Sequence, residues 1–112
     1  MELIVDALPT ATIIHVNATR IDAPVALQFK EGMRTLTART DGRFILDLEQ
    51  VDFIDSSGLG AVVASMKQLR PGQTLELAAL QPIVEKVFRL TRMDTIFKIH
   101  DTADQGVVSG EG

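Results

Sequence analysis

The hydrophobic and polar positions of this chain follow a period of two in some segments and a helical period in others. Residues 2–7 and 11–18 are rich in β-forming side chains, and Pro9 between them favours a turn, so they predict an opening hairpin. Residues 43–48 are apolar at both alternating positions, as in a central strand covered on both faces. The pattern predicts strands at residues 2–7, 11–18, 43–48, 74–79 and 96–100.

Three segments between these strands carry apolar residues at helical spacing. The first helix is predicted from Pro24, shortly after the capping residue Asp22, to about residues 41–42. A third helix is predicted from Pro82. The second helix has its apolar positions at Leu59, Val62, Val63, Met66 and Leu69.

The resulting order is β-β-α-β-α-β-α-β, which predicts a single α/β domain. Strands that alternate with helices favour a mixed central sheet with mainly parallel crossovers and helices packed on it. We expect this domain to span residues 1–100, and residues 101–112 to form a flexible C-terminal tail that has little to bury. In such sheets, binding sites gather where strands end and helices begin.

Composition narrows the possible functions. The chain has 112 residues and no cysteine, which excludes disulfides, thiol redox chemistry and Cys-based zinc sites. A net charge of −4 and the absence of Tyr and Trp argue against direct nucleic-acid binding. No apolar run is long enough to span a membrane, and Glu2 and Asp6 do not fit a signal peptide. These features predict a cytoplasmic protein whose partner is another protein.

The stretch DSSGLG, residues 55–60, lies where the second helix should begin. Serine is a preferred N-cap, an aspartate near the first turn favours the helix dipole, and glycine relieves a tight entry, so capping alone accounts for all six residues. However, a cap needs only one serine, and no Glu or Gln follows at the capping-box position. A functional interpretation of Ser56 and Ser57 therefore stays open beside the structural one.

An enzymatic interpretation finds little support in the sequence. A serine nucleophile needs a base within reach, and the G-x-S-x-G motif is absent. His15 and His100 fall in predicted strands, where surface or satisfied roles in the sheet are expected. Gly58 and Gly60 begin a dinucleotide-binding motif, but Val63 occupies its third glycine position. We expect no catalytic residue, no cofactor and no metal.

With its surroundings, this stretch resembles the signature of the STAS domain in bacterial anti-sigma factor antagonists. The resemblance is carried by ILDLEQVDFIDSSGLGAVVASMKQL, and it extends more weakly to RIDAPVALQFKEGM upstream and QPIVEKVFRLTRMDTIFKI downstream. It implies a partner-switching role. Ser57 corresponds to the serine that a serine-kinase anti-sigma factor phosphorylates and a PP2C-type phosphatase restores. Asp22 corresponds to an acidic residue near that site, and Thr19 stands where the family usually has glycine.

The implied mechanism is physically consistent with a helix N-terminus, which tolerates an added phosphate. The partner-binding residues expected from the resemblance form an apolar contact patch around Gly58, Leu59 and Val62, whose binding an added charge on Ser57 would oppose. The full set of expected site residues is Asp22, Asp55, Ser56, Ser57, Gly58, Leu59 and Val62. The alternative interpretation is a structural STAS subunit of a transport or signalling assembly, in which the serine is only a cap.

Overall fold

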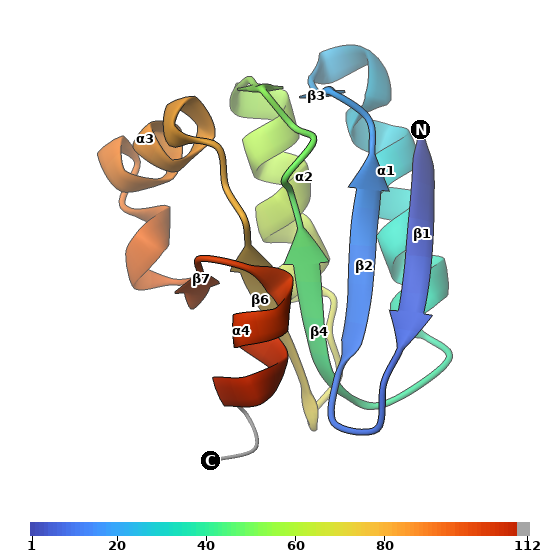
Figure 1. Ribbon diagram of the computed structural model, residues 1–112. Helices are drawn as coiled ribbons and strands as arrows, with labels where there is room; N and C mark the ends of the chain where they lie inside the picture. Colours follow the sequence, from blue (N-terminus) through green and yellow to red (C-terminus); the bar gives the residue numbers. More distant parts are fainter. Residues whose placement is uncertain (110–112) are drawn as a thin grey trace.

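The computed structural model describes residues 1–109, and within them a five-stranded mixed sheet forms the centre of the domain (Figure 1). The strand order is β1-β2-β4-β6-β7. β1 and β2 form the predicted antiparallel hairpin, and the remaining neighbours pair in parallel. The strands are β1 (Glu2–Ala7), β2 (Thr12–Asn17), β4 (Gly42–Asp47), β6 (Gln73–Ala78) and β7 (Ile99–His100).

Helices cover both faces of this sheet, as the pattern of its central strand predicts. In β4, Phe44 and Leu46 point into the larger core, whereas Ile45 points to the opposite face, and all three are buried. One face is covered by α1 (Ala23–Thr37), α2 (Ser56–Lys67) and α3 (Pro82–Leu90), and the opposite face by α4 (Ala103–Ser109) (Figure 1).

The C-terminal segment differs from the predicted tail. Residues 103–109 form α4 instead, because Ala103 and Val107 pack on Ile45 and its buried neighbours. Arg43 also donates a hydrogen bond of 2.6 Å to the carbonyl oxygen of Gly106. The expectation that this segment has little to bury is therefore wrong for residues 103–109. The last three residues of the predicted tail lie outside the described residues.

Two predicted boundaries also shift. α1 ends at Thr37, and the chain then turns through Gly42, whose φ of 97° favours glycine. The last strand contains only residues 99–100, since only these two pair with β6; a short 3₁₀ helix, η1 (Met93–Thr95), and a turn precede it. Phe97 then packs edge-on against Phe88, with ring centroids 6.2 Å apart.

A second, two-stranded sheet was not predicted. β3 (Arg20–Ile21) and β5 (Phe53–Ile54) pair in parallel, with Ile21 opposite Ile54. This pairing brings the segment before α1 against the segment before α2. The N-termini of α1 and α2, which are distant in sequence, therefore lie side by side (Figure 1).

Candidate functional site

Asp55 joins the N-termini of α1 and α2. Its Oδ1 atom accepts a hydrogen bond of 2.8 Å from the backbone N–H of Gly58, which makes Asp55 the N-cap of α2. Its Oδ2 atom accepts a bond of 3.0 Å from the N–H of Ala23, at the start of α1. The bond from Gly58 lowers the pKa of Asp55, against an opposing effect of burial, and the bond from Ala23 lowers it further. One carboxylate thus caps two helices.

Ser56 and Ser57 are the first two residues of α2, and both are exposed. Within residues 1–109, neither hydroxyl makes a hydrogen bond. The interpretation of a serine as the helix cap is therefore wrong, because Asp55 supplies the cap. Neither hydroxyl is needed to cap α2, so both are available at the helix N-terminus to react or to make contacts.

Gly58 is buried where α2 passes closest to β3. A Cβ atom at this position would lie 1.8 Å from the carbonyl oxygen of Ile21, far inside van der Waals contact. Because that neighbour is backbone, no side chain can rotate to make room. The glycine is required by the close approach of helix and strand, which fixes the first turn of α2 and hence the position of Ser57.

The predicted apolar contact patch is only partly at the surface. Val62 is 0% exposed and packs in the main core, so its predicted role in partner contacts is wrong. Gly58 is also buried, and Leu59 is half-buried against the core. The surface at this end of α2 is therefore formed mainly by the two serines and the exposed Gly60.

Asp22 directly follows β3, and Asp55 directly follows β5. The pairing of these strands therefore places the two aspartates at neighbouring strand ends. Asp22 occupies the N-cap position of α1, but its side chain makes no cap hydrogen bond. Its Oδ2 atom instead accepts a bond of 2.9 Å from Nε of Arg20. The backbone carbonyl of Thr19 accepts a bond of 2.8 Å from the N–H of Asp52, so the chain before β3 is held in place with a threonine there.

Sequence reasoning missed a groove between α1 and α2. Its volume is about 250 Å³, and it begins beside Ser57. Residues on α2 at spacings of three, four and seven line one side, and three residues of α1 line the other. The lining consists of Ser57, Gly60, Ala61 and Ala64 from α2 and Ala26, Leu27 and Lys30 from α1. The small side chains of this α2 face were the signal that the sequence offered.

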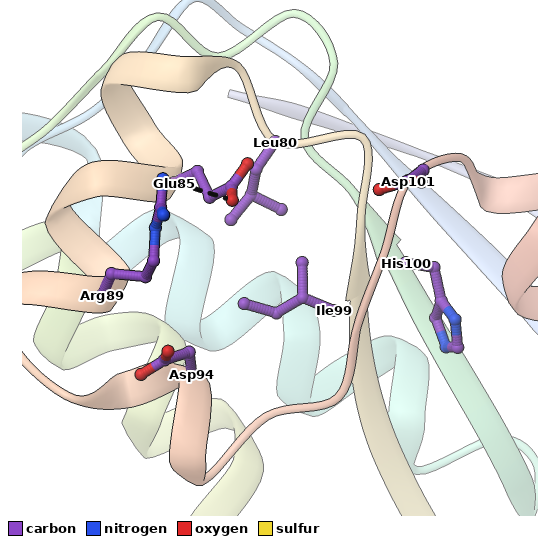
Figure 2. Close-up of a pocket in the computed structure, with 7 residues that line it drawn as sticks. All are labelled: Leu80, Glu85, Arg89, Asp94, Ile99, His100 and Asp101. Carbon is purple, nitrogen blue, oxygen red and sulfur yellow. Dashed lines mark ion pairs between the residues drawn. The ribbon is translucent and has the colours of Figure 1, made fainter.

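A second cavity, of about 220 Å³, lies between α3, η1 and β7 (Figure 2). An ion pair of 3.5 Å joins Arg89 to Glu85 on its α3 side, and Asp94 faces it from η1. The imidazole of His100 points away from this cavity (Figure 2). Its Nε2 atom lies 2.7 Å from Oε1 of Glu76, on the other face of the sheet.

Both histidines have the satisfied roles in the sheet that their positions predict. His15 Nδ1 lies 2.7 Å from Asp47 Oδ2, and the two residues are neighbours in the parallel pairing of β2 and β4. The carboxylate of Glu76, which contacts His100, also accepts two hydrogen bonds from Arg43. Within residues 1–109, neither imidazole hydrogen-bonds to a serine.

The described residues form an α/β domain in which two exposed serines, without hydrogen bonds from their hydroxyls, begin a helix that is capped by Asp55. The chain matches the STAS domain model over residues 2–106, and it belongs to that family. None of the helices in residues 1–109 is long and apolar enough to cross a membrane.

Curated relatives and solved structures agree with this assignment. A proposed anti-sigma factor antagonist, BtrV of Bordetella bronchiseptica, is 35% identical over 89 residues, or 79% of this chain and 70% of the relative. The anti-sigma-B factor antagonist of Listeria monocytogenes is 31% identical over 94 residues, which cover 83% and 81% of the two chains. The structure of the anti-sigma factor antagonist SpoIIAA in its unphosphorylated form has a TM-score of 0.74 at 21% identity, covering 95% and 93%.

Proposed function

We propose that this protein is an anti-sigma factor antagonist that acts by partner switching in the cytoplasm. In its unmodified form it binds a serine-kinase anti-sigma factor, which then releases its sigma factor. Phosphorylation of Ser57 blocks this binding, and a PP2C-type phosphatase restores it. The observation that carries the proposal is the pair of exposed, unbonded hydroxyls at the N-terminus of α2, where Asp55 already caps the helix.

The covalent step is a transfer of the γ-phosphoryl group of ATP. The Ser57 Oγ atom forms the new bond to phosphorus, the bond to the β-phosphate oxygen breaks, ADP leaves, and the hydroxyl proton passes to a base on the kinase. We assign Ser57 rather than Ser56 as the acceptor, because Ser57 lines the groove between α1 and α2. Ser56 is then a neighbouring contact residue.

Phosphorylation changes the surface of this domain while leaving its fold in place. A phosphoserine adds about −1.5 to −2 charges, and the free N–H groups and dipole of a helix N-terminus favour an anion. A partner that covers Ser57 must desolvate that charge, which commonly costs several kcal/mol. The partner surface that we propose comprises Asp22, Asp55, Ser56, Ser57 and the exposed part of Leu59.

The first test is phosphorylation by candidate kinase anti-sigma factors from the source genome. Phosphopeptide mass spectrometry after incubation with ATP should place the phosphate on Ser57, and Ser57→Ala should remain unmodified. Ser56→Ala is the matched control and should still accept the phosphate. Label that persists in Ser57→Ala and disappears in Ser56→Ala would reverse the assignment.

Binding is tested by calorimetric titration of the kinase with wild type, Ser57→Ala and Ser57→Asp. We expect Ser57→Ala to bind like wild type, and Ser57→Asp to bind at least 100-fold more weakly, because several kcal/mol correspond to more than two decades. Ser56→Asp adds the same charge one residue away and should have a smaller effect. Equal affinities for wild type and Ser57→Asp contradict partner switching and favour a structural STAS subunit instead.

A further inference from the structure

The groove beside Ser57 contains one charged side chain, that of Lys30. Lys30 is exposed, and its ammonium group makes no ion pair within residues 1–109. The hydroxyl of Ser57 at the other wall has no hydrogen-bond partner in the same residues. The unmodified groove is therefore lined by both an unneutralised cation and an unbonded hydroxyl.

The groove has room for a phosphoryl group because its α2 wall is built from small residues. Gly60, Ala61 and Ala64 follow Ser57 along the same face of the helix. A Cβ atom added at Gly60 would meet nothing within 4 Å. The volume of about 250 Å³ corresponds to several water molecules, each of which occupies about 30 Å³ of the liquid.

We propose that Lys30 pairs with the phosphate on Ser57 and holds the phosphoryl group in the groove between α1 and α2. This inference rests on the proposed phosphorylation of Ser57. A lysine ammonium on its flexible four-carbon stem is well suited to such a contact. The charged groups on the segments beside the start of α2 are the carboxylates of Asp22 and Asp55, which repel a phosphate, and the guanidinium of Arg20, which is already paired with Asp22. Lys30 is a cation in the groove that has no carboxylate partner within residues 1–109.

This pairing gives phosphorylation a second effect on the partner surface. A phosphoryl group held by Lys30 occupies part of the groove as well as adding charge at its rim. A partner side chain that enters the groove of the unmodified protein beside Ser57 must then compete with the phosphate for that space. Lys30 is a positioning residue for the phosphate and takes no part in the transfer step.

The test uses the full chain with phosphoserine incorporated at position 57 during translation, so that no kinase is needed. The second ionisation of the phosphate is followed by ³¹P NMR as a function of pH. Pairing with Lys30 favours the dianion, so the midpoint should rise by about half a pH unit in Lys30→Gln. Gln has a helix propensity close to that of Lys, and melting curves verify that the variant is folded.

Two controls isolate the contact. Lys67→Gln removes the same charge from the far end of α2, about 15 Å along the helix from Ser57, and should leave the midpoint unchanged. Phosphoserine at position 56, which is absent from the groove lining, should titrate alike with and without Lys30. An unchanged midpoint in Lys30→Gln, or equal changes for phosphate at positions 56 and 57, would overturn the pairing.

Failure of this inference is distinguishable from failure of the proposed function. If kinases modify Ser57 but Lys30→Gln does not change the titration, only the pairing is wrong. If no kinase modifies Ser57, the proposed switch fails, while the encoded phosphoserine still reports whether the groove binds a phosphate.

Discussion

Replacement of Gly58 by alanine tests whether α2 is fixed against β3 as closely as the structure requires. The added Cβ would lie 1.8 Å from the carbonyl oxygen of Ile21 and 2.6 Å from its carbonyl carbon. Both atoms are backbone, so the first turn of α2 must move away from β3. That movement disturbs the hydrogen bond between Gly58 N–H and Asp55 and opens the packing beneath the serines.

The magnitude follows from two opposing effects. Alanine in place of glycine favours the helix by up to about 1 kcal/mol, whereas overpacking usually costs about 1 to 3 kcal/mol and occasionally more. Because the clash involves a carbonyl group that cannot rotate away, we expect a cost of about 3 to 4 kcal/mol, above the usual range, and hence a net loss of about 2 to 3 kcal/mol. For a domain of 112 residues this lowers the melting temperature by roughly 8 to 13 °C.

Gly60→Ala is the matched control, two residues further along the same helix. Its added Cβ meets nothing within 4 Å, so only the gain in helix propensity remains, about 0.5 to 1 kcal/mol of added stability. Urea and thermal unfolding followed by circular dichroism measure both variants. If Gly58→Ala is as stable as wild type, or gains stability as Gly60→Ala does, the close approach of α2 to β3 is refuted.

The remaining predictions concern the charged residues around the site and in the sheet. Asp22→Ala should slow phosphorylation or weaken kinase binding but change the free energy of unfolding by less than about 1 kcal/mol, since its side chain makes no cap bond and pairs with the exposed Arg20; a variant that unfolds instead would contradict this. Burial opposes ionisation of Glu76, but hydrogen bonds from Arg43 and His100 outweigh it and lower its pKa, so its contribution to stability is present above its unfolded-state pKa and is lost as pH falls through the folded value. Urea unfolding from pH 7 to pH 3 should therefore show a smaller loss in the free energy of unfolding for Glu76→Gln than for wild type. An equal dependence of this free energy on pH in the two proteins would contradict the prediction. At pH 7, Glu76→Gln should lose about 1 to 3 kcal/mol because Arg43 loses its carboxylate partner.

The main sheet and three of its helices are predictable from sequence because each is long enough to show a period. Residues 43–48 are apolar at both alternating positions, and the structure covers β4 on both faces. The predictions of the hairpin and of the helix starting at Ser56 are also confirmed, and both segments are long enough to show a period. Periodicity reports which face of an element is buried, and these elements have well-defined faces.

The elements that were missed owe their stability to contacts between distant residues. β3 and β5 contain two residues each, which is too short to show any alternation. Residues 103–109 offer only two inward-facing apolar side chains, and the helix there depends on the sheet beneath it and on the bond from Arg43 to Gly106. Local pattern contains none of this information.

The site was predicted at the correct place in the chain but with some of the wrong residues. Val62 lies on the apolar face of its helix, and that same spacing predicts a position facing the core, so it was a poor choice for a surface contact. The double cap by Asp55 was not predictable, because it depends on α1 beginning beside α2. The α1 wall of the groove, including Lys30, was missed for the same reason.

The way α2 is anchored decides which kind of kinase can use Ser57. The first turn of this helix is tied to Asp55 and packed on β3 through Gly58, so unwinding it to present an extended peptide would break the cap and the packing together. A kinase that recognises the folded surface avoids this cost, since Ser57 is already exposed. If Ser57 is phosphorylated as we propose, such a kinase must bind the region around Ser57 in order to modify it. The surface for binding and the surface for phosphorylation are then one surface, and we expect the added charge to weaken the complex in which it is transferred.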